Sequence, residues 1–586
     1  MFRFQLYCPQ GTPTTVIITP ETSNEDDTVL YCHKAPIDWD KMSYNFSRDE
    51  FFIGLISEYS GQLGWVAQAR EWLNNLYLTV GSNVEISIQI TCFDRTVHKF
   101  VYFINGVLNL SNYSIQQTRS DCNFEQSKFF QAFRNFGEVN LDVRQTFSLA
   151  TNTEYPHGIP ITPIAPVDLF ININSECQTT CKAFRPYDLF KSLIKIMIGA
   201  DIAIRSPLLQ IEGVDGATDT GDLAYKMITL GKMIRGFNNA TLSLSLKTLF
   251  KCFKIFCVGL SIEQDTDTGE YFIYIDKIEK FFDRNIVHEI TNPKNLEFTI
   301  DTDHSFKTID IGFNKYQKPQ NNSISGREFN LKNNYTTPLS SINSSLDVTS
   351  DIRADGTAIK LLIDAKVSVE DNSENQLDGE IFIIDSFIDL NNDNILTARK
   401  DELFTTVIDD STSAAPEVML NIDLTPARLL KTTGWGSIIH SGLKKYNSQY
   451  LRLNPGETLS QLRTRRNNET ADISENAAVL ISTLGWPYFS GQMALLNFTL
   501  EIEDILAIKR NPRGIIKIYD NIHRKNIYCW VKEAPSEPID KATNGQFYVC
   551  SEDVVETAVK SKIKTINNDG YIKNMSGGYI FSINEN

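Results

Sequence analysis

The chain has 586 residues, of which 42% are hydrophobic and 22% charged, and its formal net charge at pH 7 is −16. This length is enough for several domains with well-buried cores, and the composition is typical of a soluble globular protein. The acidic balance argues against an ordinary nucleic-acid-binding protein, because such proteins need a basic surface to displace counterions. It is compatible with a surface past which DNA slides without adhering, since like charges repel.

The start of the chain lacks the pattern of a secretory signal, because Pro9 and Gly11 interrupt it before an apolar core has developed. No run approaches the roughly 20 apolar residues that a membrane helix requires. The ten cysteines are scattered, most of them in apolar surroundings. We therefore expect reduced, buried thiols, no membrane-spanning segment and synthesis in a cytoplasm.

The pattern along the chain predicts an α+β, β-rich protein with several tube-like β-barrel or sandwich modules and a few amphipathic helices. The four predicted domains are a tube-like β domain at 1–150, a helix and β-hairpin domain at 151–318, an acidic strand-rich domain at 319–424, and a helix and β domain at 425–586. In the first domain, residues 84–93 alternate between apolar and polar side chains. This alternation predicts a strand with one buried face. Residues 15–19 and 99–104 are further strand candidates.

The second domain begins after an apolar, Pro-rich passage at 156–166, which we expect to pack in extended form over a neighbour. A helix is predicted from Pro186, because five apolar residues after it share one helical face. These residues are Leu189, Phe190, Leu193, Ile194 and Met197. The helix is expected to end near Gly199 and to be followed by a strand at 201–204.

A second helix–strand phrase follows sixty residues later. The predicted helix has Ser245 as its N-cap and Gly259 as its stop. Residues 260–263 and 271–276 then alternate around the turn at 265–269, which is typical of a hairpin. Both helices contain the letters Leu-Phe-Lys, starting at Leu189 and at Leu249. This similarity indicates either a duplicated helix–strand unit or two amphipathic helices that match by chance.

The sequence pattern of the second half of the chain predicts mostly strands. Residues 308–316 alternate as a strand, 319–345 are rich in Asn and Ser and are expected to form an exposed connection, and 358–388 look strand-like and acidic. A helix is expected from Pro426 with Thr425 as its cap. Further strands are predicted at 497–502, 514–519 and 526–531, the last two forming a hairpin around a polar turn.

One segment resembles half of a calcium loop, because Asp389, Asn391 and Asp393 space three oxygen-bearing side chains two residues apart. The usual glycine is Asn394, however, and Lys400 stands where a bidentate glutamate belongs. An Asx-rich turn after a strand explains the pattern equally well. The sequence leaves the choice open, and we predict no metal or cofactor site.

Other candidate motifs are incomplete. Cys177 and Cys181 have no second Cys or His pair to complete a zinc site. The glycines at 216–221 have phosphate-loop spacing, but Asp222 replaces the required lysine and would repel phosphate. No catalytic residue is predicted, and the chain is expected not to be an enzyme. A hydrolase whose site is assembled from distant Asp and Glu residues is the alternative.

Two surface features remain open. A basic cluster runs from Lys444 to Arg466, and we expect either a solvated face or a contact with an anionic partner or nucleic acid. Its members are Lys444, Lys445, Arg452, Arg463, Arg465 and Arg466. The aromatic phrase at 486–489 suits a buried core or a subunit contact, and would suit a sugar platform if it were exposed.

Several short sequence phrases follow one another in an order that spans most of the chain. They are 37–39, the alternating unit that includes 84–93, the helix and hairpin at 246–276, and the phrases at 309–316, 335–338, 424–428 and 514–531. This order resembles tail hub or baseplate proteins of phages that infect Bacteroidetes-type bacteria. The resemblance implies a structural protein of the virion, made in the host cytoplasm.

The resemblance further implies a homo-oligomeric ring, a trimer, with two tube-like β-barrel domains in each subunit. Such a ring has pseudo-sixfold symmetry and joins a hexameric tail tube to a threefold tip. Its implied partners are tube, tip and receptor-binding proteins, and DNA would pass through it without specific binding. A receptor- or glycan-binding tail protein is the alternative function.

Overall fold

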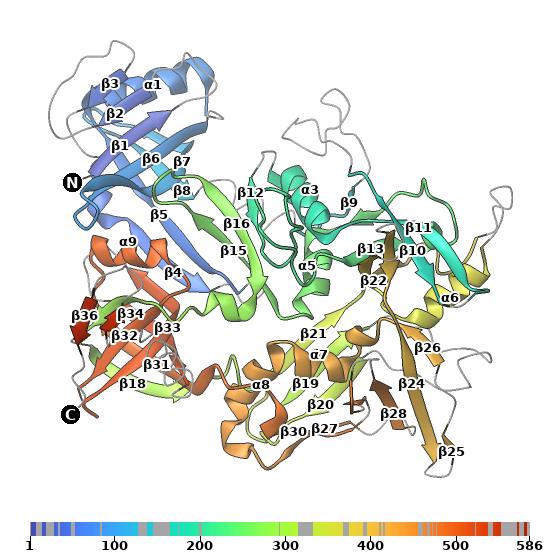
Figure 1. Cartoon of the computed structure of the whole chain (residues 1–586). Helices are drawn as coiled ribbons and strands as arrows, with labels where there is room; N and C mark the ends of the chain where they lie inside the picture. The colour runs from blue at the N-terminus through green and yellow to red at the C-terminus, as the bar shows by residue number, and fades with distance from the viewer. Residues whose placement is uncertain are drawn as a thin grey trace.

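The structure is a computed structural model. It describes residues 2–7, 15–18, 29–32, 36–48, 53–82, 85–126, 137–143, 164–173, 175–198, 202–291, 293–314, 332–366, 374–390, 395–409, 412–413, 417–454, 461–465, 469–471, 473–475, 477–521, 523–536, 543–551, 571–573 and 579–582. The fold is a β-rich, multi-domain α+β fold with several sheets and a few helices, as the sequence predicts (Figure 1).

The N-terminal β unit comprises residues 2–126. Its elements are β1 (Phe2–Tyr7), β2 (Thr15–Ile18), β3 (Val29–Cys32), η1 (Trp39–Lys41), β4 (Ser43–Arg48), β5 (Leu55–Trp65), α1 (Ala67–Val80), β6 (Glu85–Asp94), β7 (Lys99–Ile115) and β8 (Ser120–Gln126). The alternation predicted for residues 84–93 is confirmed, because Ile86, Ile88 and Ile90 of β6 are fully buried. Burial of every second side chain fixes the register of a strand. Strand β7 is much longer than the predicted segment 99–104.

The C-terminal β unit is assembled from two separate parts of the chain, 286–300 and 489–551. Its elements are β17 (Ile286–Ile290), β18 (Lys294–Ile300), β31 (Phe489–Phe498), α9 (Ile502–Arg510), β32 (Ile515–Asp520), β33 (Lys525–Ser536) and β34 (Thr543–Cys550). The predicted hairpin of β32 and β33 is confirmed. Like the N-terminal β unit, this unit carries one longer helix.

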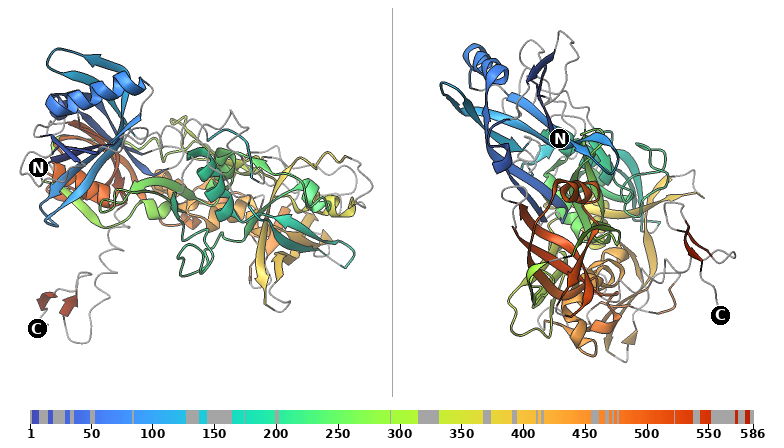
Figure 2. Two further views of the ribbon diagram at one scale, coloured as in Figure 1. Left: turned by 90° about the horizontal axis from the view of Figure 1, so that it is seen from above. Right: turned by 90° about the vertical axis from the view of Figure 1, so that its left-hand side faces the viewer.

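The two β units pair edge to edge into one 14-stranded sheet, in the order β18-β31-β34-β33-β4-β5-β8-β7-β6-β1-β2-β3 with β32 and β17 branching from β33. The seam between them is the antiparallel pair of β4 and β33, in which Phe46 lies opposite Ala534. Both units contribute to one hydrophobic core. They lie together at one end of the elongated molecule (Figure 2).

The central unit contains the two predicted helices. Its elements are β9 (Leu141–Asp142), α3 (Pro186–Ile198), β12 (Ala203–Arg205), β14 (Ser243–Leu244), α5 (Leu246–Lys254), β15 (Val258–Gln264), β16 (Tyr271–Lys277) and η2 (Ile278–Phe281). The five apolar residues predicted for one face of α3 are all buried. The hydroxyl of Ser245 accepts a hydrogen bond from the Thr248 amide, so its predicted N-cap role is confirmed.

The two helix–strand phrases are related in space as well as in sequence. Helices α3 and α5 meet through Phe190 and Phe253, whose ring centroids are 5.7 Å apart. The strands that follow them, β12 and β15, lie on either side of β16 in one three-stranded sheet. Strand β12 runs parallel to β16 and β15 runs antiparallel to it, so the two strands run in opposite directions.

The remaining elements form smaller sheets at the other end of the molecule (Figure 1). One five-stranded sheet contains β10 (Val167–Asn172), β11 (Gln178–Ala183), β13 (Lys226–Leu230), β22 (Ile381–Asp389) and β23 (Ile395–Ala398). A second contains β19 (Thr308–Phe313), β20 (Lys332–Thr336), β21 (Ser345–Ser350), β27 (Tyr450–Leu453) and β30 (Val479–Leu480). A third contains β24 (Lys400–Asp409), β25 (Thr412–Ser413), β26 (Glu417–Leu420), β28 (Gln461–Arg465) and β29 (Ile473–Ser474).

Short helices accompany these sheets, and one further strand pair stands apart. The helices are α4 (Gly231–Ile234), α6 (Gly356–Asp364), η4 (Ile422–Leu424), α7 (Pro426–Thr432), α8 (Trp435–Leu443), η5 (Lys444–Tyr446) and η6 (Ile481–Thr483). The pair consists of β35 (Tyr571–Lys573) and β36 (Tyr579–Ser582). Helix α7 begins at Pro426, as predicted. In the part of the chain that the structure describes, no helix is long and apolar enough to cross a membrane.

Four local predictions are wrong. Residues 358–364 form most of helix α6 instead of a strand, and residues 499–502 lead into helix α9. Helix α5 ends at Lys254, well before Gly259, which lies within β15. Part of the expected connection at 319–345 is strand β20, in which Tyr335 is fully buried. For β20, the burial of Tyr335 in the tertiary structure overrides the local pattern.

Two predictions concern regions that the structure covers only in part. The Pro-rich passage at 156–166 lies mostly outside the described residues, as do Gly199 and the start of the strand predicted at 201–204. The division into four domains stays a prediction. Strands from the first, second and fourth of these segments nevertheless share the 14-stranded sheet.

Candidate functional site

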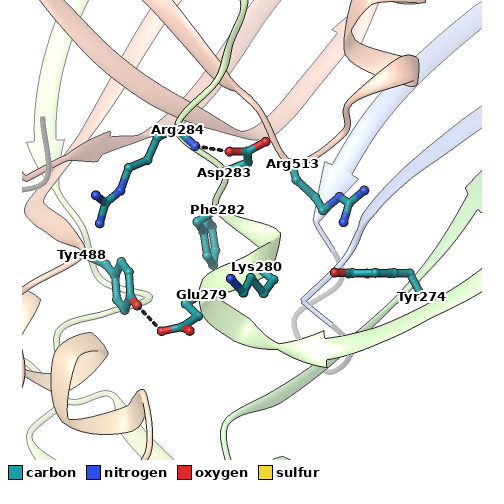
Figure 3. A pocket seen from close by; sticks show the side chains of 8 residues that line it. All are labelled: Tyr274, Glu279, Lys280, Phe282, Asp283, Arg284, Tyr488 and Arg513. Atoms are coloured by element: carbon teal, nitrogen blue, oxygen red, sulfur yellow. Dashed lines mark hydrogen bonds between the residues drawn. The ribbon is translucent and has the colours of Figure 1, made fainter. Parts of the chain in front are cut away.

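A cavity of about 510 Å³ lies where the central unit meets the C-terminal β unit. It is lined by Tyr274 of β16, Glu279 and Lys280 of η2, Phe282, Asp283 and Arg284 of the following turn, Tyr488 before β31 and Arg513 before β32 (Figure 3). Its volume lies in the range of small-ligand sites. Five of the eight lining side chains are charged, so the cavity is suited to a polar ligand.

Phe282 fixes the floor of this pocket. Its ring packs edge-on against Phe489 and Trp530, with centroids 4.9 and 5.3 Å away, and the Arg48 guanidinium lies 4.5 Å above it. These neighbours come from β31, β33 and β4, so the turn after η2 is anchored to both β units. The packing of Phe282 therefore holds the backbone of this turn in a fixed position.

The carboxylate of Asp283 is fully engaged within the protein. One oxygen accepts the backbone N–H groups of Arg284 and Asn285, at 2.6 and 3.3 Å. The other accepts the side-chain amides of Asn285 and Asn511, at 2.7 and 3.2 Å. The Asp283 amide in turn donates to the carbonyl of Arg513 at 2.7 Å. Asp283 thus ties the turn after η2 to the loop before β32.

Glu279 is engaged by a tyrosine. The Tyr488 hydroxyl donates to a carboxylate oxygen of Glu279 at 2.7 Å (Figure 3). Burial, and then the hydrogen bond to this carboxylate, raise the pKa of Tyr488 well above its ordinary value. Tyr488 therefore stays protonated and remains a donor to Glu279.

The three cations of the pocket are less engaged than its acids. The Arg513 guanidinium lies 4.3 Å from the Tyr274 ring centroid and 3.6 Å from Glu263, but its Nε atom is buried without a hydrogen-bond acceptor. Lys280 and Arg284 are exposed, and their side chains form no ion pair with any described carboxylate. Donors with full positive charge therefore face the cavity with free hydrogen-bonding capacity.

The residues singled out from the sequence lie elsewhere. Asp389 ends β22, whereas Asn391 and Asp393 are outside the described residues, so the calcium question stays open. Cys177 and Cys181 are both buried, Cys181 on strand β11 and Cys177 directly before it. No group of three or more His, Cys, Asp or Glu side chains that could hold a metal occurs among the described residues.

The basic cluster is spread over several elements. Lys444 and Lys445 belong to η5, Arg452 to β27, and Arg463 and Arg465 to β28, while Arg466 is outside the described residues. The Lys444 ammonium donates to the Ser551 hydroxyl at 3.1 Å. This bond links the cluster to the end of the C-terminal β unit.

The aromatic phrase at 486–489 divides between surface and core. Trp486 is 79% exposed, Tyr488 lines the pocket and Phe489 is fully buried. The sequence indicated Tyr488 as a candidate, but it did not indicate the cations. Lys280, Arg284 and Arg513 have no motif around them, because the fold alone brings them together.

No family model and no curated protein matches the sequence. Among solved structures, the chain is similar to a 43 kDa tail protein of prophage MuSo2 from Shewanella oneidensis, with 8% identity and a TM-score of 0.35 over 94% of this chain and 99% of that one. It is also similar to a tail protein from Neisseria meningitidis MC58, with 7% identity and a TM-score of 0.33 over 94% and 97% of the two chains. The prophage tail protein gp18 from Listeria monocytogenes EGD-e has 7% identity and a TM-score of 0.26 over 89% and 100%.

Proposed function

We propose that this chain is a structural protein of a phage tail. It forms a hub or baseplate ring that connects the tail tube to the tip and surrounds the DNA passage. The proposal rests on the order of short sequence phrases described above, together with one architectural observation. It includes no catalytic step and no cofactor, and it places the protein in the virion after synthesis in the host cytoplasm.

The architectural observation is the edge-to-edge pairing of two β units, each with one longer helix, within a single chain. The resemblance drawn from the sequence implies two tube-like β domains per subunit. Three copies of a chain with two such units place six β units around one axis. A ring of this kind matches a sixfold tube on one face and a threefold tip on the other.

The acidic charge of the chain supports the same proposal. A formal net charge of −16 disfavours adhesion to DNA, which favours transit of the DNA past the protein. The partners in this proposal are further copies of the chain and the neighbouring tube, tip and receptor-binding proteins of the tail. A Bacteroidetes-type host belongs to the proposal only through the resemblance.

The position of the chain in an intact particle tests this proposal. Cryo-electron microscopy of phage that carry the gene is expected to show density for the chain as a closed ring between the tail tube and the tip. Density for single copies at the periphery of the tail would contradict the hub assignment. Absence of the chain from purified particles would contradict a virion role altogether.

A receptor- or glycan-binding tail protein is the second candidate, and one observation favours it. Trp486 is 79% exposed, and large exposed aromatic rings serve as stacking platforms for sugars. Binding of host polysaccharide that Trp486→Ala abolishes would favour this function. Unchanged binding in that variant, or no binding at all, would leave the structural role as the better explanation.

A further inference from the structure

We propose that the pocket between η2 and the C-terminal β unit binds an oxyanion, either a phosphate group or a carboxylate. Arg284 and Lys280 would supply the charge and Arg513 the additional donor. This inference concerns the ligand of one pocket in a single chain. It does not depend on the proposed role in a phage tail.

The acids of the pocket already accept hydrogen bonds from within the protein. Both oxygens of Asp283 accept N–H donors, and one oxygen of Glu279 accepts the hydroxyl of Tyr488. An incoming cation would therefore have to compete with donors that already hold these carboxylates in place. The pocket is for this reason poorly suited to a cationic ligand, although it contains two acidic residues.

The second step is that the cations retain free donors. An arginine carries five N–H donors and a lysine three, and the side chains of Arg284 and Lys280 donate to no described carboxylate. The buried Nε of Arg513 has no acceptor at all. The exposed donors of Arg284 and Lys280 are therefore available to ligand oxygens.

The third step is geometry. Figure 3 shows Arg284 beside Tyr488 on one side of the Phe282 ring, and Lys280 and Arg513 on the other. Cations on both sides of one pocket favour a ligand with several oxygen atoms over a neutral or singly bonded one. Phosphate groups and dicarboxylates both fit this description. Arginine is especially suited to them because its planar fork matches two oxygens at once.

The rigid floor supports a preformed site. Phe282 is held by Phe489 and Trp530, and Asp283 ties the turn to the loop that carries Arg513. A site whose donors are fixed in advance loses little entropy when the ligand binds. The proposed oxyanion therefore meets a preformed backbone and has to order only the exposed side chains of Arg284 and Lys280.

The test is a calorimetric titration of the full-length chain with inorganic phosphate and, separately, with succinate, each against chloride at equal ionic strength. We expect saturable binding of at least one probe. Tighter binding of phosphate would identify a phosphoryl ligand, and tighter binding of succinate a carboxylate such as an Asp or Glu side chain of a docking protein. Binding of neither probe would overturn the proposal.

Matched variants separate the pocket from general charge effects. Arg284→Ala should weaken binding by about 10- to 150-fold, because one charge-assisted hydrogen bond contributes on the order of 1.5–3 kcal/mol. Arg524→Ala removes the same charge from an exposed position in the turn between β32 and β33, away from the pocket lining, and should leave affinity unchanged. An equal loss in both variants would overturn the proposal.

A third variant tests the sign of the effect. Glu279→Gln removes one negative charge from the pocket wall and keeps an oxygen that the Tyr488 hydroxyl can use. We expect it to strengthen binding of the anionic probe at least twofold. A weaker or unchanged affinity in Glu279→Gln would show that charge does not govern this pocket and would contradict the proposal.

Discussion

Lys509 places an amino group in the protein interior, where its charged form is disfavoured. It lies on helix α9, is buried, and donates to the Phe103 carbonyl and, at 3.1 Å, to the Gln264 side chain. Lys509 belongs to the C-terminal β unit, Phe103 to the N-terminal β unit and Gln264 to the central unit, so these hydrogen bonds join all three units. Burial lowers the pKa of Lys509 to about 7.

This pKa predicts how stability depends on pH. The unfolded chain holds the lysine proton with a pKa of about 10.4, so between pH 7 and that value the unfolded state binds more protons and stability rises with pH. Below about pH 7 both states are protonated, and the cost of the buried charge is fully present. The stabilising effect of raising the pH is complete once the unfolded lysine has also lost its proton.

Lys509→Met removes this titration, and urea denaturation at several pH values measures the consequence. The difference in free energy of unfolding between wild type and variant should change in favour of the wild type by roughly 1 kcal/mol per pH unit between about pH 7.5 and 9.5. The subtraction cancels the titration of the buried cysteines, which both chains share. Parallel pH curves for the two chains would contradict a lowered lysine pKa.

Among the elements, the β15–β16 hairpin has a role that its local sequence did not show. Its turn packs on β7 of the N-terminal β unit, where the Tyr102 amide donates to the Thr266 carbonyl at 2.9 Å and the Asn105 side chain donates to the Gly269 carbonyl at 2.8 Å. Gly269 has φ +75°, and a Cβ atom there would lie 2.6 Å from the Tyr102 ring. The hairpin therefore docks the central unit onto the sheet.

Gly269→Ala tests this docking, and Gly213→Ala is its matched control. Both glycines have positive φ, but a Cβ at Gly213 would meet nothing within 4 Å. Each substitution should cost about 1–2 kcal/mol for the left-handed backbone, and Gly269→Ala about 1–3 kcal/mol more for overpacking against Tyr102. Thermal unfolding followed by circular dichroism measures the difference. Equal losses would show that the turn does not pack on β7.

The seam between β4 and β33 makes a second element-scale prediction. Ala534 and Phe46 are opposite each other and fully buried. Ala534→Asp would bury an unpaired carboxylate and should destabilise the chain by more than about 3 kcal/mol, whereas Asn526→Asp, at an exposed site of the same strand, should have little effect. Urea denaturation compares the two variants. Equal stability of both would mean that the seam does not hold the two β units together.

The elements that could be predicted are those with a local signal. The helix after Ser245 and the hairpins at residues 260–276 and 514–531 are encoded by caps, periodicity and turn residues close together in the chain. The sequence predicts a strand through residue 502, where helix α9 begins. The capping box of Glu501 and Asp504 is a local signal for the start of this helix. Helix α6 is a short apolar run, a pattern that strands and helices share.

The arrangement of the whole molecule could not be predicted in the same way. Strands β4 and β33 pair although nearly 500 residues separate them, and the sequence of neither strand indicates which strand it will pair with. The pocket has the same origin, because the turn after η2 meets Tyr488 and Arg513 only after the C-terminal β unit has formed. Composition and periodicity gave the fold class, whereas these contacts depend on tertiary packing.

At this scale the central claim is that the chain closes into a ring with copies of itself. Obligate interfaces of this kind commonly bury more than about 2,000 Å², so the assembly should survive dilution. The most direct test is the mass of the purified full-length protein in solution, measured by light scattering after size exclusion. We expect a stable species of three times the mass of one chain, or a larger closed ring, and a monomer at all concentrations would contradict the account.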